Sequence, residues 1–147
     1  MTDEIIDLAA FDAATPCDAG AEIELLHPVS GAPIGIFITV LGKYSEVFVD
    51  HTRRSSNEYL RKAQQLKKRG KEEETPTVEK FEEKSIDLLV ACTVGWRTGD
   101  KKTITFEGQA LEFSRTNAAK IYGSPKLSWI RAQVDEAIAD LGNFMKA

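Results

Sequence analysis

The 147-residue chain has the length of one domain with a sizeable core, and its 42% hydrophobic and 29% charged residues exclude a wholly disordered protein. Its formal net charge of −4 argues against a nucleic-acid-binding protein. Its two cysteines, Cys17 and Cys92, form no CxxC pair, which argues against a zinc site or a disulfide scaffold and suits a reducing compartment.

Residues 1–20 are acidic and rich in alanine, and they predict a flexible arm with a short turn around Leu8–Phe11. The acidic start lacks the lysine or arginine that a signal peptide needs. No apolar run of the chain approaches the roughly 20 residues that span a bilayer. We therefore expect a soluble intracellular protein with no membrane partner, in which residues 21–147 form a single domain.

Two strands are predicted at the start of that domain. Residues 21–26 alternate between polar and apolar side chains, as a half-buried strand does. Residues 34–41 are dense in β-branched and aromatic residues, and turn-forming residues separate the two runs. Together the runs predict a β-hairpin with a long loop. The near-continuous apolar run of the second strand predicts that both of its faces are covered.

A long helix is predicted to follow the hairpin. Ser45 is a suitable N-cap, and the helix should run from Glu46 to about Arg69 before Gly70 stops it. Polar residues interrupt its apolar face, so we expect a partly solvated helix that is held at its ends. The charged residues of 70–77 then predict a linker.

The next helix is predicted to begin after Thr77, which is a suitable cap. One face of this helix is predicted from residues that recur at helical spacing, which are Val78, Phe81, Ser85, Leu88, Cys92 and Trp96. This pattern predicts a central core helix that continues to Trp96, where the sequence WRTGDKK ends it.

Residues 103–114 predict a second hairpin with a two-residue turn. With Gly108 in the first central position and Gln109 in the second, the turn would be type II′. The register that follows pairs Phe106 with Leu111 and Ile104 with Phe113. Ser114 is then a suitable cap for a short helix that Gly123 ends.

The last predicted helix starts with Ser124 as its N-cap and Pro125 in its first turn. It carries one apolar stripe, formed by Leu127, Ile130, Val134, Ile138 and Leu141. Trp129 lies beside the stripe, where a tryptophan covers a second element or an interface. The stripe could hold the protein's own core or a partner. As partner-binding residues we predict Leu127, Trp129, Ile130, Val134 and Ile138.

The predicted elements follow the order ββα–α–ββ–α–α, without a repeat. This order predicts an α+β fold, with small β-hairpins packed with about four helices in a mostly helical single domain.

A search for chemistry predicts no catalytic, cofactor-binding or metal-binding residue, and therefore no enzyme. His27 and His51 have no serine, cysteine or acid at the spacing of a triad or a metal site. The sequence LGKYS lacks the first glycine of a phosphate-binding loop. The basic run of residues 53–71 contains one aromatic residue, Tyr59, and three glutamates follow it. We expect this run to be a solvated helix or a docking surface for an acidic partner.

Two segments resemble the tail assembly chaperones of long-tailed bacteriophages and their prophages. The first is residues 22–48, with the pattern HP..G.P.GI.I.VLGK.S. The second is residues 90–138, in which a helix ending in a tryptophan precedes a small strand pair, the pattern F(S)..NA..I and then W(I/L)R.QVDEAI.

The resemblance implies a function that composition and periodicity do not give. Such chaperones bind the tape measure protein, keep it soluble and recruit tail tube protein, and they are not retained in the virion. They commonly exist in two lengths through a ribosomal frameshift, and this chain looks like the short form. The resemblance also implies self-association, in the cytoplasm of the host cell. Two alternatives remain open at this point: a structural tail component of the virion, or a small nucleic-acid-binding regulator.

Overall fold

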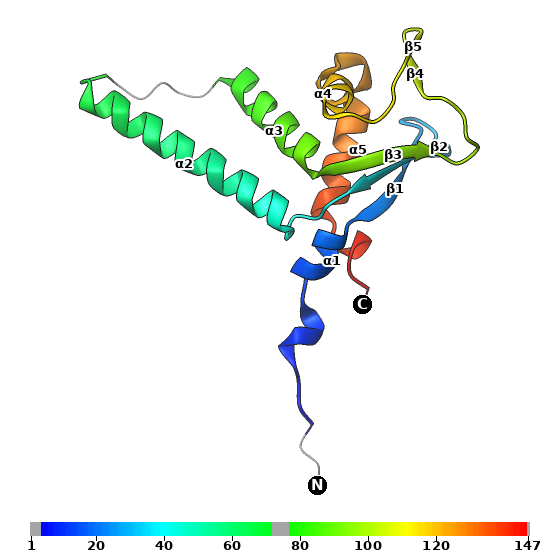
Figure 1. The fold of residues 1–147 in the computed structure, drawn as a ribbon, viewed down its shortest axis with the longest axis horizontal. Helices are drawn as coiled ribbons and strands as arrows, with labels where there is room; N and C mark the ends of the chain where they lie inside the picture. Colours follow the sequence, from blue (N-terminus) through cyan, green and yellow to red (C-terminus); the bar gives the residue numbers. More distant parts are fainter. Residues whose placement is uncertain (1–3, 72–76, 147) are drawn as a thin grey trace.

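The chain folds into a three-stranded antiparallel sheet with helices packed on one of its faces (Figure 1). The computed structural model describes residues 4–71 and 77–146. Within them the α-helices are α1 (Ala14–Ala19), α2 (Glu46–Lys68), α3 (Val78–Cys92), α4 (Arg115–Gly123) and α5 (Ser128–Ala139). The strands are β1 (Ala21–Leu26), β2 (Pro33–Val40), β3 (Thr93–Thr98), β4 (Thr105–Phe106) and β5 (Gln109–Ala110). Short 3₁₀ turns are η1 (Leu8–Phe11), η2 (Pro125–Leu127) and η3 (Leu141–Asn143). The predicted α+β class is confirmed.

The central strand of the sheet is β2, which pairs with β1 on one side and β3 on the other. The predicted hairpin of β1 and β2 is therefore confirmed. The apolar spacing predicts that the preceding helix continues as far as Trp96, so strand β3 is not among the predicted elements. The helix ends at Cys92, and Trp96 instead lies opposite Ile38 in the sheet. Pairing with β2, which a local pattern does not reveal, decides between the two conformations.

One face of β2 is buried and the other is partly open. Ile38 and Val40 are almost fully buried beneath the helices, whereas Phe37 is half-buried on the opposite face. The guanidinium group of Arg97 lies 4.5 Å from the centre of the Phe37 ring and shields it in part. The prediction that both faces of β2 are covered is therefore correct only for the face that packs beneath the helices.

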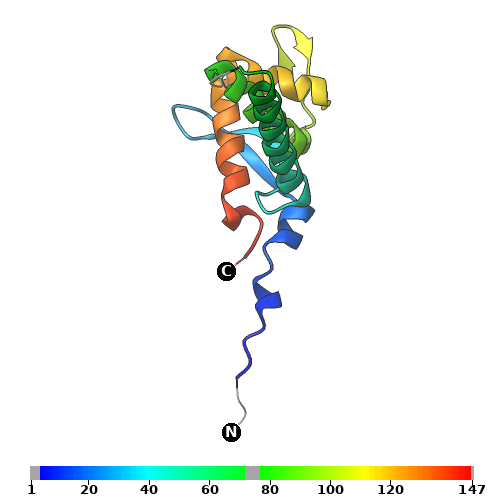
Figure 2. The ribbon, with the colours of Figure 1, turned by 90° about the vertical axis from the view of Figure 1, so that its left-hand side faces the viewer.

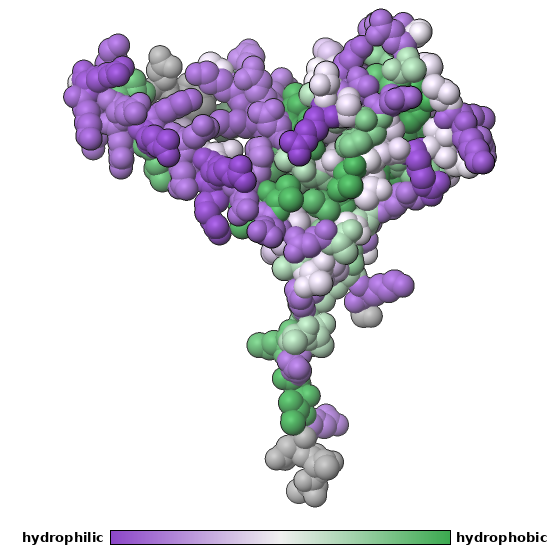
Figure 3. Space-filling view, viewed as in Figure 1, coloured by the Kyte–Doolittle hydropathy of each residue, from purple (hydrophilic) through white to green (hydrophobic). Residues whose placement is uncertain are grey.

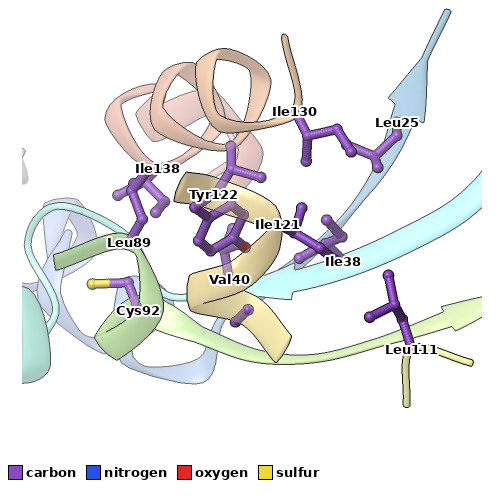
Figure 4. Packing of buried hydrophobic residues seen from close by; sticks show 12 residues of the cluster. Leu25, Ile38, Val40, Leu89, Cys92, Leu111, Ile121, Tyr122, Ile130 and Ile138 are labelled. Atoms are coloured by element: carbon purple, nitrogen blue, oxygen red, sulfur yellow. The ribbon is translucent and has the colours of Figure 1, made fainter. Parts of the chain in front are cut away.

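The core lies between the sheet and the helices α3, α4 and α5, as Figure 4 shows. In Figures 1 and 2, α5 crosses the sheet, with which it is in contact through β1 and β2. The residues of the core come from the sheet and from all three helices. The largest fully buried ones are Leu25, Ile38, Val40, Leu89, Tyr122, Val134 and Ile138. The core therefore joins segments from both ends of the chain.

Helix α2 is anchored at its beginning and reaches away from the sheet (Figure 1). The side chain of Ser45 accepts a hydrogen bond from the backbone N–H of Phe48 at 3.2 Å, which confirms the predicted cap. No residue of α2 is buried. The prediction of a solvated helix is correct, and beyond its anchored N-terminal end α2 is in contact with α3, where the ammonium group of Lys84 lies 5.9 Å from the centre of the Tyr59 ring. In the described part of the chain, neither this helix nor any other combines the length and apolar character needed to cross a membrane.

Helix α1 lies within the stretch that was predicted to be a flexible arm. Its Cys17 side chain is fully buried, so this part of the stretch belongs to the folded body. The predicted turn at Leu8–Phe11 is present as η1. Most of the predicted charged linker, residues 72–76, lies outside the described residues.

The turn of the small hairpin of β4 and β5 lies one residue earlier than predicted, so each cross-strand partner differs by two residues from the predicted one. Phe106 pairs with Gln109, so the two turn residues are Glu107 and Gly108. Their φ angles are 51° and 81°, and two positive φ angles define a type I′ turn. The predicted type II′ turn is therefore wrong, and the carbonyl of Ile104 accepts its hydrogen bond from Leu111 at 2.8 Å.

The two C-terminal helices begin in different ways. Ser114 caps α4 as predicted and accepts a hydrogen bond from the N–H of Asn117 at 3.0 Å. Ser124 makes no capping hydrogen bond through its side chain, so its predicted role is wrong. The segment Pro125–Leu127 instead forms η2, and α5 begins at Ser128.

Candidate functional site

Three of the five predicted partner-binding residues lie inside the protein's own core. Ile130, Val134 and Ile138 are 7%, 0% and 2% exposed, and all three belong to the buried cluster shown in Figure 4. The stripe of α5 therefore packs α5 against its own chain. Val134 and Ile138 therefore pack within the protein's own core, whereas Ile130 also lines the cavity described next.

The other two predicted residues, Leu127 and Trp129, are half-buried and line an apolar cavity of about 150 Å³. We call this cavity the apolar pocket. It lies between the sheet, the β4–β5 hairpin and the start of α5. Its lining comes from Leu25, Ile34, Ile36, Ile38, Trp96, Ile104, Thr105, Phe106, Leu111, Ile121, Tyr122, Leu127, Trp129 and Ile130. Both tryptophans of the chain are in this lining.

Trp96 is held in the pocket wall by two contacts. Its indole N–H donates a hydrogen bond to the carbonyl of Leu111 at 3.1 Å. Its ring meets the ring of Phe113 edge to face, with centroids 5.0 Å apart. Sequence reasoning missed this residue as a site residue because it placed Trp96 on a helix. Val94, Trp96 and Thr98 stand at every second position, and this spacing was the signal for a strand.

The pocket offers apolar contact and little polar chemistry. The Tyr122 hydroxyl is already bonded to the Thr93 hydroxyl at 2.7 Å, and the Trp96 N–H is bonded to the backbone. An ion pair of 2.8 Å joins Lys126, in η2, to Glu107 at the hairpin tip. Apolar cavities of this kind exclude water and accept apolar groups. The arrangement is therefore suited to holding an apolar side chain.

Two titratable groups of the core, Cys92 and Tyr122, are held in their neutral forms at neutral pH. Burial raises the pKa of the Cys92 thiol to about 11, so Cys92 is a poor nucleophile at neutral pH. Burial likewise raises the pKa of Tyr122 to about 12, although its hydrogen bond with Thr93 opposes this shift. His27 has a structural role, because its ring Nδ1 accepts hydrogen bonds from two backbone N–H groups of its own turn. Across residues 4–71 and 77–146, no three histidine, cysteine or acidic side chains gather to hold a metal ion.

A second hollow runs between α3 and α5, and we call it the α3–α5 groove. It is lined by Val78, Phe81, Glu82, Ser85, Ser128, Arg131, Ala132 and Asp135. Val78 and Phe81 are 74% and 61% exposed, so the prediction that α3 is a core helix along its whole length is wrong. Only its last turns, with Leu89 and Cys92, are buried. Sequence reasoning missed this groove, because helical spacing does not distinguish a buried stripe from an exposed one.

No protein-family model, no curated protein and no solved structure matches this chain.

Proposed function

We propose that this protein is a non-enzymatic assembly chaperone of a long-tailed bacteriophage, which acts in the host cytoplasm and is absent from the finished virion. It binds the tape measure protein, keeps it soluble and brings tail tube subunits to it. The family and the client come from the sequence resemblance in residues 22–48 and 90–138. The observation that carries the activity is the apolar pocket, because a holding protein needs an accessible apolar surface and no reactive group.

The pocket receives one apolar side chain from a helical segment of the client. An apolar cavity of this order of volume holds a group about the size of a benzene ring. Recognition of amphipathic helices depends on such anchors, spaced three, four or seven residues apart. Trp129 and Leu127 make direct contact with the client in this proposal, and the more deeply buried Ile130 lines the pocket beside them.

The α3–α5 groove extends the same kind of surface. The exposed Val78 and Phe81 offer further apolar contact to a client helix. The ion pair of Arg131 with Glu82, at 3.6 Å, adds a polar rim to this contact. A long apolar client therefore meets two apolar surfaces, the apolar pocket and the α3–α5 groove. Residues of α5 contribute to both.

The test places a charge at the open edge of the pocket. Ile34 lines the pocket and is 38% exposed, so the substitution Ile34→Arg charges the pocket mouth while the core stays intact. Co-expressed with the tape measure protein of the same phage genome, the parent chaperone should keep that client in the soluble fraction. The Ile34→Arg variant should leave most of the client in the pellet, because an apolar group would have to displace water from a buried cation.

The matched control is Val94→Arg, which adds the same charge to an exposed apolar strand position (53% exposed) outside the pocket lining. It should behave like the parent, and thermal melts by circular dichroism should show that both variants are folded. Full client solubility with Ile34→Arg would remove the pocket from the proposal. Failure of the parent chain to raise client solubility, or abundant copies of it in purified virions, would contradict the chaperone function itself.

One observation favours a second candidate, a nucleic-acid-binding regulator. Residues 53–69 of α2 and its C-cap carry seven lysines and arginines but one acid, Glu58. A gel-shift assay at two salt concentrations tests it, since binding through phosphates weakens steeply with salt. We rank this candidate second because Tyr59 is the single aromatic residue there and no other stacking side chain accompanies it.

A further inference from the structure

The N-terminal arm, defined here as residues 4–13, presents large apolar side chains to solvent. Ile5, Ile6, Leu8 and Phe11 are 89%, 79%, 79% and 62% exposed. Figure 1 shows the arm leading away from the body, and Figure 3 shows hydrophobic residues along it. Contiguous exposed apolar side chains of this kind mark interaction sites. The arm therefore has the character of a docking element.

The base of the arm is fixed to the folded body. The N–H of Gly42 donates a hydrogen bond to the carbonyl of Cys17 at 3.1 Å, and the N–H of Glu46 donates to the Asp18 carboxylate at 2.7 Å. A Cβ atom added at Gly42 would lie 2.3 Å from the Cys17 sulfur, so the two segments are in close contact. The apolar side chains of the arm therefore project from a point that is fixed beside the start of α2.

Two acidic side chains give the arm local order. The Asp7 carboxylate accepts a hydrogen bond from the N–H of Ala9 at 2.9 Å and caps η1. The Asp12 carboxylate accepts from the N–H groups of Ala14 at 2.9 Å and Thr15 at 3.1 Å, at the start of α1. A segment with such preformed turns loses less conformational entropy when it docks than a fully disordered one.

Helix α2 complements the arm in charge and exposes two apolar side chains among its cations. One face of the helix, which we call the α2 stripe, carries Val49, Arg53, Leu60 and Lys67 at steps of four and seven residues. Val49 and Leu60 are 38% and 58% exposed. The arm carries three acids and no lysine or arginine, whereas residues 53–69 carry seven cations and one acid.

We propose that the arm of one molecule docks on the α2 stripe of a second copy. The apolar side chains of the arm cover Val49 and Leu60, while its carboxylates face Arg53 and Lys67. Because the two surfaces are different patches of the same chain, the contact is head-to-tail and builds a ring or an open chain of molecules. The resemblance implies self-association alone, and the assignment of the arm and the α2 stripe as the contact surfaces goes beyond it. The test of this assignment needs no client.

The first test measures molecular mass by light scattering over a range of protein concentrations. The parent chain should exceed the 16.3 kDa of one copy, and its mass should fall as salt screens the contact. The double substitution of Ile6 and Phe11 by serine should raise the dissociation constant by about tenfold or more. Leu60→Glu should do the same from the other side. The matched control is Val29→Ser, which removes a 90% exposed apolar side chain from a loop and should leave the mass unchanged.

The decisive test mixes the two defective variants. The arm variant keeps an intact α2 stripe, and the Leu60→Glu variant keeps an intact arm. Each should be monomeric alone, and an equimolar mixture should form a dimer that does not grow further, because only one arm and one stripe remain functional. A parent chain that is monomeric at every concentration would overturn the proposal. Two other results would overturn it as well: an arm variant with the mass of the parent, and a mixture that stays monomeric. If each arm docks on its own α2, the parent is monomeric, and this result also counts against the proposal.

Discussion

Tyr122 links three elements through a chain of two hydrogen bonds. It is 1% exposed, and its hydroxyl lies 2.7 Å from the hydroxyl of Thr93. Thr93 in turn donates to the carbonyl of Leu89, also at 2.7 Å, so the Tyr122 O–H is the donor in the first bond. This chain ties α4 to the junction of α3 and β3. It pairs both buried hydroxyl groups at a point where the backbone changes from helix to strand.

The substitution Tyr122→Phe should destabilise the protein by about 1 kcal/mol near neutral pH, because it removes one buried hydrogen bond but keeps the ring. The pH dependence should also change. The pKa of Tyr122 is raised from 10.0 to about 12, so its stabilising contribution is present below pH 10 and is lost as the pH rises towards 12. Urea unfolding at neutral pH and above pH 10 should therefore show a smaller alkaline loss in the variant.

The buried thiol of Cys92 contributes to the same measurement. Its pKa is raised from 9.0 to about 11, so it adds a loss of stability of its own over that interval. Charge on Cys92 also helps to raise the pKa of Tyr122, so the difference between the two stability curves reports Tyr122 together with this coupling. Parallel curves throughout the alkaline range would show that Tyr122 does not titrate with folding.

At the scale of elements, the sequence correctly predicted the features that depend on residues close together in the chain. The caps at Ser45, Thr77 and Ser114 were identified correctly, because a cap depends on residues within one helical turn. Strand β3 was missed, because the spacing from Val78 to Trp96 fits a helix and only pairing with β2 favours the strand.

The turn of the β4–β5 hairpin was placed one residue too late for a similar reason. Glu107 adopts a positive φ of 51°, which is uncommon outside glycine, so its position in the turn was not expected from the sequence. The residue that follows it, Gly108, adopts such an angle readily. The cross-strand pairing of Thr105 with Ala110 fixes the register that the turn residues alone left open.

Gln133 shows how α5 is held to the edge strand, and it gives the prediction at this scale. Its side-chain oxygen accepts from the N–H of Leu26 at 2.9 Å, and its side-chain nitrogen donates to the carbonyl of Leu26 at 2.8 Å. Gln133→Ala should cost about 1 kcal/mol and speed hydrogen exchange at Leu26.

Gln133→Glu is the informative companion, because it keeps the acceptor and loses the donor. At neutral pH its carboxylate should face the Leu26 carbonyl unfavourably, and protonation in acid should restore a donor. Its stability relative to Gln133→Ala should therefore rise as the pH falls. Equal pH dependence of the two variants would show that the paired hydrogen bonds do not hold α5 to β1.

At the scale of the whole molecule, the sequence located one side of the candidate site. Leu127 and Trp129 were predicted and do line the apolar pocket, whereas Trp96, Ile34 and Phe106 were not predicted as site residues. The missed residues come from the sheet and the small hairpin, and long-range packing brings them to α5. The stripe on α5 showed that its residues are buried, but a periodic pattern does not say against what.

The apolar pocket, the arm and the α2 stripe are separate surfaces, so one molecule can use all three at the same time. The apolar pocket lies beside the sheet, while the arm and α2 leave the body in different directions (Figures 1 and 2). Copies joined through the arm and α2 would keep their pockets free for a client. A long client could then be covered by many copies, each of which contributes one weak apolar contact.

The fluorescence of the two tryptophans provides the most direct measurement of the central claim. Trp96 and Trp129 are the only tryptophans of the chain, and both line the pocket. Titration with peptides tiled along the tape measure protein should shift the emission to shorter wavelengths and saturate for at least one apolar, helix-forming peptide. The Ile34→Arg variant should show no such shift. A complete absence of response to every peptide, or an equal response in the variant, would contradict the account.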